Sequence, residues 1–194
     1  MARGFRRQVP YADRPLVFFD LETTGFRAGY NEITEAAFIH EKLGAKCIRI
    51  APRHMERFHP DAQRVSGYRE ADWIDAKDLS ALTGVFYQYL EDAIVIGHNI
   101  LGFDMPFMAA DFRAKNLTPP DVIEASCIDT QQLALMFLRS ELRNLKLSSV
   151  CTYFGISNEG EHNAYDDVLR TKLVFEKFEK HCKWHGKVKQ EELW

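Results

Sequence analysis

Short apolar segments of β-favouring residues occur at intervals along the chain. Three of them, at 16–20, 32–40 and 46–51, are joined by short turns, which predicts an antiparallel meander. Two more, at 93–97 and 122–128, are expected to be strands, and the first is apolar throughout, as in a strand that is buried on both faces. The pattern therefore predicts a sheet of about five strands.

Helical periodicity dominates the segments between and after these strands. In 78–92, apolar residues recur every three or four positions, which is typical of an amphipathic helix. The same pattern predicts helices over 104–116, 130–139, 145–154 and 162–180, and the stretch 59–68 is expected to form a short helix that Gly67 ends. A meander followed by alternating helices and strands predicts an α/β fold with a mixed sheet and helices on both faces. We expect a single domain over 1–194, with a core of about 15–180 between a short N-terminal arm and a polar C-terminal tail from Trp184.

Composition and charge narrow the class of protein. The 194 residues are 46% hydrophobic and carry a formal net charge of −3, so the chain can form a substantial core but is not a basic protein that binds duplex by charge alone. No apolar run approaches the roughly 18 residues that cross a bilayer, and no apolar segment follows the N-terminal arginines as in a secretory signal. The four cysteines are far apart, which indicates free thiols in a reducing compartment. We therefore expect a soluble cytoplasmic domain without a membrane partner.

Two acidic residues close the first predicted strand. Because side chains alternate between the faces of a strand, Asp20 and Glu22 point the same way. Two acids at the tip of an apolar strand repel each other, and a divalent cation would relieve this repulsion because such cations prefer oxygen ligands. Taken alone, such a pair is more often exposed to water at a turn, which is the alternative interpretation. We interpret Asn31, Glu32 and Glu35, near the start of the meander, as surface or turn residues.

Further acids and a histidine lie where strands end and helices begin. Asp104 starts the helix after the fourth predicted strand, where its alternative role is that of a helix cap, and Asp129 is expected to cap the next helix. His162, Asp166 and Asp167 open the last predicted helix, where a histidine alone is most simply a surface residue. In open α/β sheets, sites gather at the carboxyl ends of strands. Four carboxylates that converge there would bind two divalent cations. The four belong to Asp20, Glu22, Asp104 and Asp167.

The order and spacing of these residues resemble the motifs of DEDD-type 3′–5′ exonucleases of the DEDDh branch. This is the family of the proofreading subunit of bacterial replicative polymerases, and its fold is RNase H-like. The first motif matches as FFDLETTG (18–25), the second as GHNILGFDMPFM (97–108) and the third as HNAYDD (162–167), in which the spacing favours Asp167 over Asp166 as a ligand. In the second motif, three residues (100–102) follow the asparagine where many members with the histidine have two, a spacing similar to that of exonuclease domains inside large DNA polymerases.

The resemblance implies a hydrolase that uses two Mg²⁺ ions, for which Mn²⁺ can substitute. Asp20 would bridge both ions, Glu22 and Asp167 would support the first ion, and Asp104 would support the second. His162 would be the general base that takes a proton from the attacking water, since imidazole titrates near neutrality.

Four further residues would hold the substrate. The resemblance implies that the backbone around Leu21 and Thr23 meets the terminal 3′ hydroxyl and base. Asn99 and Phe103 are expected to form a wall of the site. Because stacking tolerates every base, we expect a broad base preference.

The leading hypothesis is a two-metal-dependent 3′–5′ exonuclease that hydrolyses single-stranded DNA or frayed 3′ ends to nucleoside 5′-monophosphates. It would serve proofreading or repair, alone or beside a DNA polymerase, and its partner would be the 3′ end of a single strand, DNA in preference to RNA. One alternative keeps the chemistry and changes the substrate to RNA. A second is a non-catalytic module that binds nucleic acid or a polymerase; such a module would be expected to lack one of the five catalytic side chains, and all five are present.

Overall fold

The computed structural model describes residues 9–122, 126–159 and 163–191, with side chains up to residue 181. Five strands form one mixed sheet in the order β3-β2-β1-β4-β5. The strands are β1 (Leu16–Thr23), β2 (Ile33–His40), β3 (Gly44–Arg49), β4 (Ile94–Gly97) and β5 (Cys127–Asp129). The first three strands are the predicted antiparallel meander, and β4 and β5 run parallel to β1. The prediction of a mixed five-stranded sheet is confirmed.

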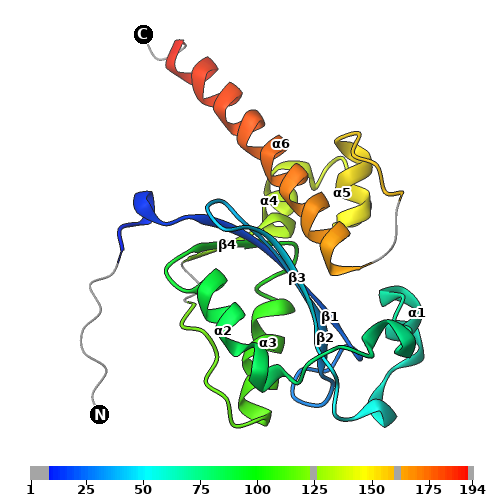
Figure 1. Ribbon diagram of the computed structural model, residues 1–194. Coiled ribbons are helices and arrows are strands. Elements are labelled where there is room, and N and C mark those ends of the chain that lie inside the picture. Colours follow the sequence, from blue (N-terminus) through cyan, green and yellow to red (C-terminus); the bar gives the residue numbers. More distant parts are fainter. Residues whose placement is uncertain (1–8, 123–125, 160–162, 192–194) are drawn as a thin grey trace.

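Helices cover both faces of this sheet, as predicted. In Figure 1, α2 and α3 lie on one face, and α4, α5 and α6 lie on the other. The helices are α1 (Pro60–Ser66), α2 (Leu79–Leu90), α3 (Asp104–Ala114), α4 (Thr130–Leu138), α5 (Leu147–Tyr153) and α6 (Ala164–Glu191). Each corresponds to a predicted helix, and α1 ends, as predicted, at Gly67, which has a positive φ of 64°, a conformation that glycine adopts without steric cost.

Strand β1 contributes side chains to the cores on both faces. Val17 and Phe19 pack among the residues of α2 and α3, whereas Phe18 points to the opposite face and meets the ring of Phe175 on α6 at 5.7 Å. Because side chains alternate along a strand, the next residues on the Phe18 face are Asp20 and Glu22. The hydrophobic contact between β1 and α6 therefore places two acids of β1 beneath the first turns of α6.

The prediction that β1 ends at Asp20 is wrong. The strand continues to Thr23, because β2 keeps pairing with it, and Asp20 and Glu22 lie opposite Ala37 and Glu35 of β2. On the other edge, β4 pairs only with residues 16–18 of β1. The last part of β1 thus has a partner on one side and an open edge on the other, beside the loop that follows β4.

The interpretation of Asn31, Glu32 and Glu35 as surface or turn residues is also wrong, because all three are buried. Burial of such groups requires partners. Asn31 donates from Nδ2 to the carbonyl of Arg57 at 2.9 Å, and Glu32 forms an ion pair with the buried amine of Lys115 at 2.7 Å. The partners lie 26 or more residues along the chain, so local sequence could not reveal them.

The last helix is longer than predicted. Expected to end near 180, before a polar tail from Trp184, α6 continues to Glu191, and its C-terminal part extends beyond α4 and α5 (Figure 1). The extension over 181–191 contains three lysines, a glutamine and a glutamate, which are good helix formers, and no proline. Within the described ranges, no helix combines the length and apolar character needed to cross a membrane.

Candidate active site

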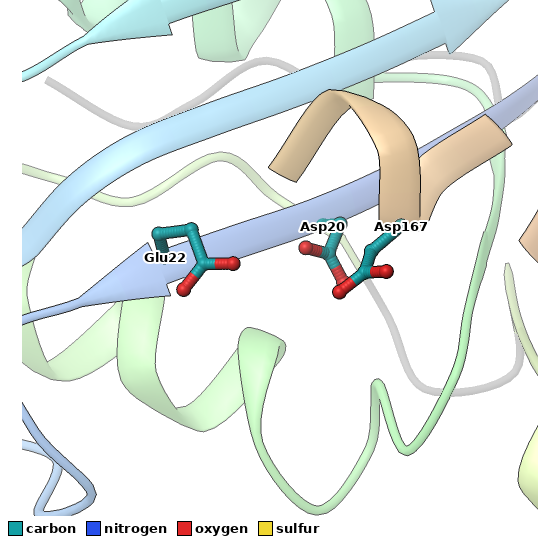
Figure 2. A group of neighbouring side chains, drawn as sticks. All are labelled: Asp20, Glu22 and Asp167. Carbon is teal, nitrogen blue, oxygen red and sulfur yellow. The ribbon is translucent and has the colours of Figure 1, made fainter. Parts of the chain in front are cut away.

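Three of the predicted carboxylates converge between the sheet and α6. Asp20 and Glu22 project from β1, and Asp167 reaches toward them from the first turn of α6 (Figure 2). One carboxylate oxygen from each residue lies within 4.8 Å of the others. Each of the three residues is partly accessible to solvent. This geometry makes an acidic cluster, formed by Asp20, Glu22 and Asp167, that a ligand can reach.

Asp104 lies next to this acidic cluster but is not one of its three members. It is the first residue of α3 and only 3% exposed, and its Oδ1 accepts a hydrogen bond from the backbone N–H of Leu21 at 3.0 Å. Its carboxylate therefore contacts the open edge of β1 and raises the pKa of Asp20. The alternative role of Asp104 as an N-cap is not observed, since Phe103 occupies that position.

Burial and repulsion between like charges raise the pKa values of Asp20, Glu22 and Asp104. Burial raises the pKa of Glu22 to about 8, with further contributions from the charges of Asp167 and Glu35. The pKa of Asp20 is raised well above its usual value, first by burial and then by the charges of Asp104 and Glu22. Burial also raises the pKa of Asp104. Without a counter-charge, the fully ionised cluster is electrostatically unfavourable.

A divalent cation fits this arrangement. The three converging side chains of the cluster offer only carboxylate oxygens, which suit Mg²⁺ and Mn²⁺. A cation would offset the repulsion that raises the pKa values of Asp20 and Glu22. Asp20, Glu22 and Asp167 are thus the residues that could hold a metal ion directly, with Asp104 beside them.

The free energy of unfolding of the metal-free protein is expected to fall as the pH rises from 6.5 to 8. Glu22 has a pKa of about 8 in the folded state and 4.5 as its ordinary value, so the folded state binds more protons in this window and loses stability as they leave. Added Mg²⁺ should therefore raise the melting temperature more at pH 8 than at pH 6.5, since metal binding displaces these protons. Thermal unfolding with EDTA or Mg²⁺ measures both effects.

A matched control for this pH dependence is Glu22→Gln, which removes one of the groups with a raised pKa and should make the EDTA profile less steep. The lowered pKa values of His40 and His98 act mainly around and below 6.5, and they make the free energy of unfolding rise with pH, which is the opposite sign. A Mg²⁺-induced gain of equal size at both pH values would contradict the assigned role of the cluster.

The family of the chain follows from its match to a family model. Residues 17–175 match the model of the RNase_T family, which is described as "Exonuclease". The chain belongs to this exonuclease family. The matched range includes β1, the loop before α3 and the start of α6, so it contains the acidic cluster and Asp104.

Relatives of this chain are much longer proteins, which it matches over only part of their length. It is 30% identical over 166 residues to a DNA polymerase III of PolC type from Halalkalibacterium halodurans, with 84% of the chain and 11% of the relative covered. It is 27% identical over 169 residues to Protein NEN2 of Arabidopsis thaliana, with 82% of the chain and 34% of the relative covered. The chain thus spans about a tenth to a third of the length of these relatives.

Solved structures share the fold of this exonuclease. A crystal structure of E. coli Exonuclease I in complex with a dT13 oligonucleotide superposes with a TM-score of 0.68 at 17% identity, covering 86% of the chain and 40% of the Exonuclease I chain. The zinc-bound complex of the same enzyme with single-stranded DNA gives a TM-score of 0.69 at 18% identity, covering 82% and 39%. Both support the RNase H-like exonuclease fold.

Glu35 is a fifth acid at the site that the sequence analysis missed. It lies opposite Glu22 in the pairing of β1 and β2, is 5% exposed, and contributes to the raised pKa of Glu22. Its Oε2 accepts a hydrogen bond from the backbone N–H of Ala164 at 3.2 Å, which fastens the N-terminus of α6 to β2. Its position, two residues before Ala37 on the same face of the strand, was the available signal.

Arg170 is a second missed residue. It is 7% exposed, and its Nη1 donates to Oδ1 of Asp167 at 2.6 Å while its Nη2 donates to the carbonyl of Glu159 at 3.2 Å. A planar guanidinium with two fixed acceptors restricts the rotamer of the carboxylate that it holds. Arg170 therefore orients Asp167 in the acidic cluster and offsets part of its negative charge.

Arg170→Leu is expected to destabilise the metal-free protein by on the order of 2–3 kcal/mol, since it leaves Asp167 among like charges without its partner. Mg²⁺ should restore part of this loss, because the ion supplies positive charge at the same carboxylate. Urea unfolding with EDTA or Mg²⁺ measures both quantities. Arg170→Lys keeps the positive charge but not the planar pair of donors, so its free energy of unfolding should lie between those of Arg170→Leu and the wild type. Identical urea midpoints for Arg170→Leu and the wild type would contradict this role.

The neighbouring residue Asp166 is directed elsewhere. Its backbone N–H donates to Oδ1 of Asn163 at 2.8 Å, and Nδ2 of Asn163 donates to Oδ2 of Asp166 at 3.3 Å. This reciprocal pair satisfies polar groups at the start of α6. The choice of Asp167 over Asp166 as the member of the cluster agrees with this geometry.

The residues predicted to hold substrate lie around the open edge of β1. The N–H of Leu21 is bonded to Asp104, and the Oγ1 of Thr23 donates to the carbonyl of Gly25 at 2.6 Å. Asn99 has a positive φ of 60°, and Phe103 packs its ring against that of Phe107 at 5.2 Å. His162, the predicted base, lies outside the described residues. The substrate roles of these side chains stay predictions.

The loop that contains Asn99 is held by a buried carboxylate. Asp129 accepts hydrogen bonds at Oδ1 from the N–H groups of Asn99 and Gln131, each at 2.9 Å. The bond to Gln131 confirms the predicted cap of α4. The bond to Asn99 was not predicted, and it fixes the path of the chain between β4 and Asp104.

Proposed function

We propose that this chain is a divalent-metal-dependent 3′–5′ exonuclease that acts on single-stranded DNA or frayed 3′ ends. The observation that carries the proposal is the convergence of Asp20, Glu22 and Asp167 within 4.8 Å, beside the buried Asp104, in a member of an exonuclease family. Such a carboxylate set suits phosphodiester hydrolysis because it could bind divalent cations. These cations would supply the positive charge that an anionic substrate needs to approach the site.

In the proposed reaction, a pair of divalent cations would activate water and neutralise charge on the leaving 3′ oxygen. Asp20, Glu22 and Asp167 would bind through their carboxylate oxygens, and Asp104 would contribute from the open edge of β1. Arg170 donates to Oδ1 of Asp167, so Oδ2 would be the oxygen that binds an ion. His162 would take the proton of the attacking water, and the product would be a nucleoside 5′-monophosphate.

The proposed preference for DNA and the proposed association with a polymerase rest on the names of the relatives and of the similar solved structures. Several are named as DNA polymerase III of PolC type, and Exonuclease I was solved with deoxyoligonucleotides. On this basis we propose a role in proofreading or repair, with the 3′ end of a DNA strand as substrate and a DNA polymerase as a partner.

Single strands of DNA and RNA, labelled at either the 3′ or the 5′ end, test this proposal when incubated with Mg²⁺ or EDTA and resolved by length. The expected result is a ladder shortening from the 3′ end of DNA, release of nucleoside 5′-monophosphate, and no reaction in EDTA. Shortening from the 5′ end, or equal activity in EDTA, would refute it, and faster cleavage of RNA would change the substrate.

A further inference from the structure

Beside the acidic cluster lies a groove that the proposed chemistry does not use. It has a volume of about 590 Å³ and runs between α1, the turn that follows it, β3 and the start of α6. Two of its lining residues, Glu35 and Asn163, also contact or cap the N-terminus of α6, so the groove begins next to the element that carries Asp167. We refer to this feature as the arginine groove.

Three arginines from separate parts of the fold line the arginine groove. Arg49 lies on β3, Arg64 lies on α1, and Arg69 lies in the turn that follows. The side chains of Arg64 and Arg69 are 75% and 76% exposed, and each pairs with a nearby aspartate within its own turn. Exposed pairs of this kind are weak, so guanidinium donors remain available to an incoming anion.

Two acidic residues, Glu35 and Asp72, also line the arginine groove, and both have hydrogen-bond partners. Glu35 is buried, and its Oε2 is bonded to the N–H of Ala164. Asp72 accepts from Arg69 at 2.6 Å through its side chain, and its backbone carbonyl accepts from Arg49 at 2.8 Å. The lining thus holds three arginines and two acids, and each arginine has an acidic partner: Arg49 lies 3.8 Å from the buried Glu35, and Arg64 pairs with Asp61 outside the lining. The pairs of Arg64 and Arg69 are the exposed ones, so these two guanidinium groups are the ones that an anion can reach.

Aromatic side chains accompany the arginines. Tyr165 is 40% exposed in the first turn of α6, two residues before Asp167, and it is one of the residues that line the groove. Trp73 forms a fixed wall: its Nε1 donates to the carbonyl of Thr34 at 2.9 Å, and the guanidinium of Arg49 lies 4.7 Å from its ring centre. Surfaces that combine a positive groove with exposed rings bind single strands without reading their sequence, through phosphates and base stacking.

We propose that the arginine groove binds the nucleotides upstream of the scissile phosphate, with Arg64 and Arg69 contacting phosphates and Tyr165 stacking on a base. This inference rests on the proposed exonuclease function and adds the path of the single strand. The volume of the groove is within the range of about 300–1,000 Å³ typical of ligand sites. The exposed guanidinium groups of Arg64 and Arg69 suit the phosphates of a DNA backbone. The start of α6 lines the groove and also carries Asp167, which suits a strand whose end lies at the cluster.

The test compares the wild type with Arg64→Gln/Arg69→Gln on a dinucleotide and on a 20-nucleotide DNA strand. The ratio of kcat/KM for the long strand to that for the dinucleotide should fall about tenfold in the double variant, mainly through KM. The salt dependence of kcat/KM for the long strand should weaken by about 1.4 in log–log slope, or 0.7 for each lost phosphate contact. Arg139→Gln, which changes an exposed arginine outside the groove lining, is the matched control and should change neither quantity.

Tyr165 is tested by binding. Fluorescence anisotropy of a labelled strand in EDTA should show about tenfold weaker binding for Tyr165→Ala, and Tyr165→Phe should bind more tightly than Tyr165→Ala because it keeps the ring. An unchanged salt slope in the arginine double variant, or equal affinity of Tyr165→Ala and the wild type, would overturn the groove assignment. A larger loss of affinity for an RNA strand than for a DNA strand in these variants would overturn the choice of DNA. Absence of hydrolysis by the wild type would refute the exonuclease function, whereas the anisotropy result would still decide the groove.

Discussion

Asp20→Asn is expected to reduce the rate of strand hydrolysis by at least about 10³-fold while the fold is retained. The amide has nearly the size of the carboxylate but no charge, so it is a poor ligand for a hard cation. Asp20 is the central acid of the site, because its pKa is raised first by burial and then by the charges of Asp104, Glu22, Asp167 and Glu35. Initial rates of release of nucleoside 5′-monophosphate from a labelled strand measure the loss.

Stability separates this effect from unfolding. Because Asp20→Asn removes one of several repelling acids, the metal-free variant should melt at a higher temperature than the metal-free wild type at pH 8. Asp166→Asn is the matched control, since Asp166 is adjacent to the cluster in sequence but pairs with Asn163, and it should retain activity. Turnover of Asp20→Asn within about tenfold of the wild type would exclude the proposed metal role.

His162→Ala is expected to lower kcat by about 10²–10⁴-fold with a much smaller change in affinity for the strand. A general base acts in the transition state, so its loss should appear in the chemical step and not in binding. Wild-type kcat should rise through about pH 6–7 as the imidazole loses its proton, and the variant should lose this rise. Single-turnover rates across this range, with Mg²⁺ held saturating, measure both.

Separate measurements of kcat and of strand affinity distinguish a general base from a residue that only binds substrate. A fall in kcat/KM that arises wholly from weaker strand binding would assign His162 to substrate holding. A wild-type profile that is flat between pH 5.5 and 8 under single-turnover conditions would contradict its role as a base.

The alternation of side chains along a strand and the apolar periodicity of helices were sufficient to predict much of the fold. Phe18 and Phe19 point to opposite cores, and this alternation correctly places Asp20 and Glu22 on one face. The same local pattern could not show where β1 ends, because its last residues are held in the strand by β2, whose partner Glu35 lies 13 positions after Glu22. Pairing with another strand therefore overrode the turn signal after Asp20.

Charged residues whose partners lie in other elements were the hardest part of the site to predict. Glu35 looked like a turn residue, but its contact with Ala164 joins positions 129 residues apart. Arg170 had a nearer signal, since it follows Asp167 by three residues on one helix, a spacing at which side chains meet. Its burial, however, depends on how α6 packs on the sheet and on the carbonyl of Glu159, which no periodicity reveals.

Titration with Mn²⁺ at pH 7.5, followed by calorimetry and by the loss of the free-ion EPR signal, tests the metal-binding role of the carboxylates most directly. The wild type should bind two ions per chain, and Asp20→Asn should lose at least one of them, while Asp166→Asn should bind like the wild type. Absence of Mn²⁺ binding to the wild type, or the same stoichiometry and affinity in Asp20→Asn, would contradict the assignment of Asp20, Glu22, Asp104 and Asp167 as the metal site.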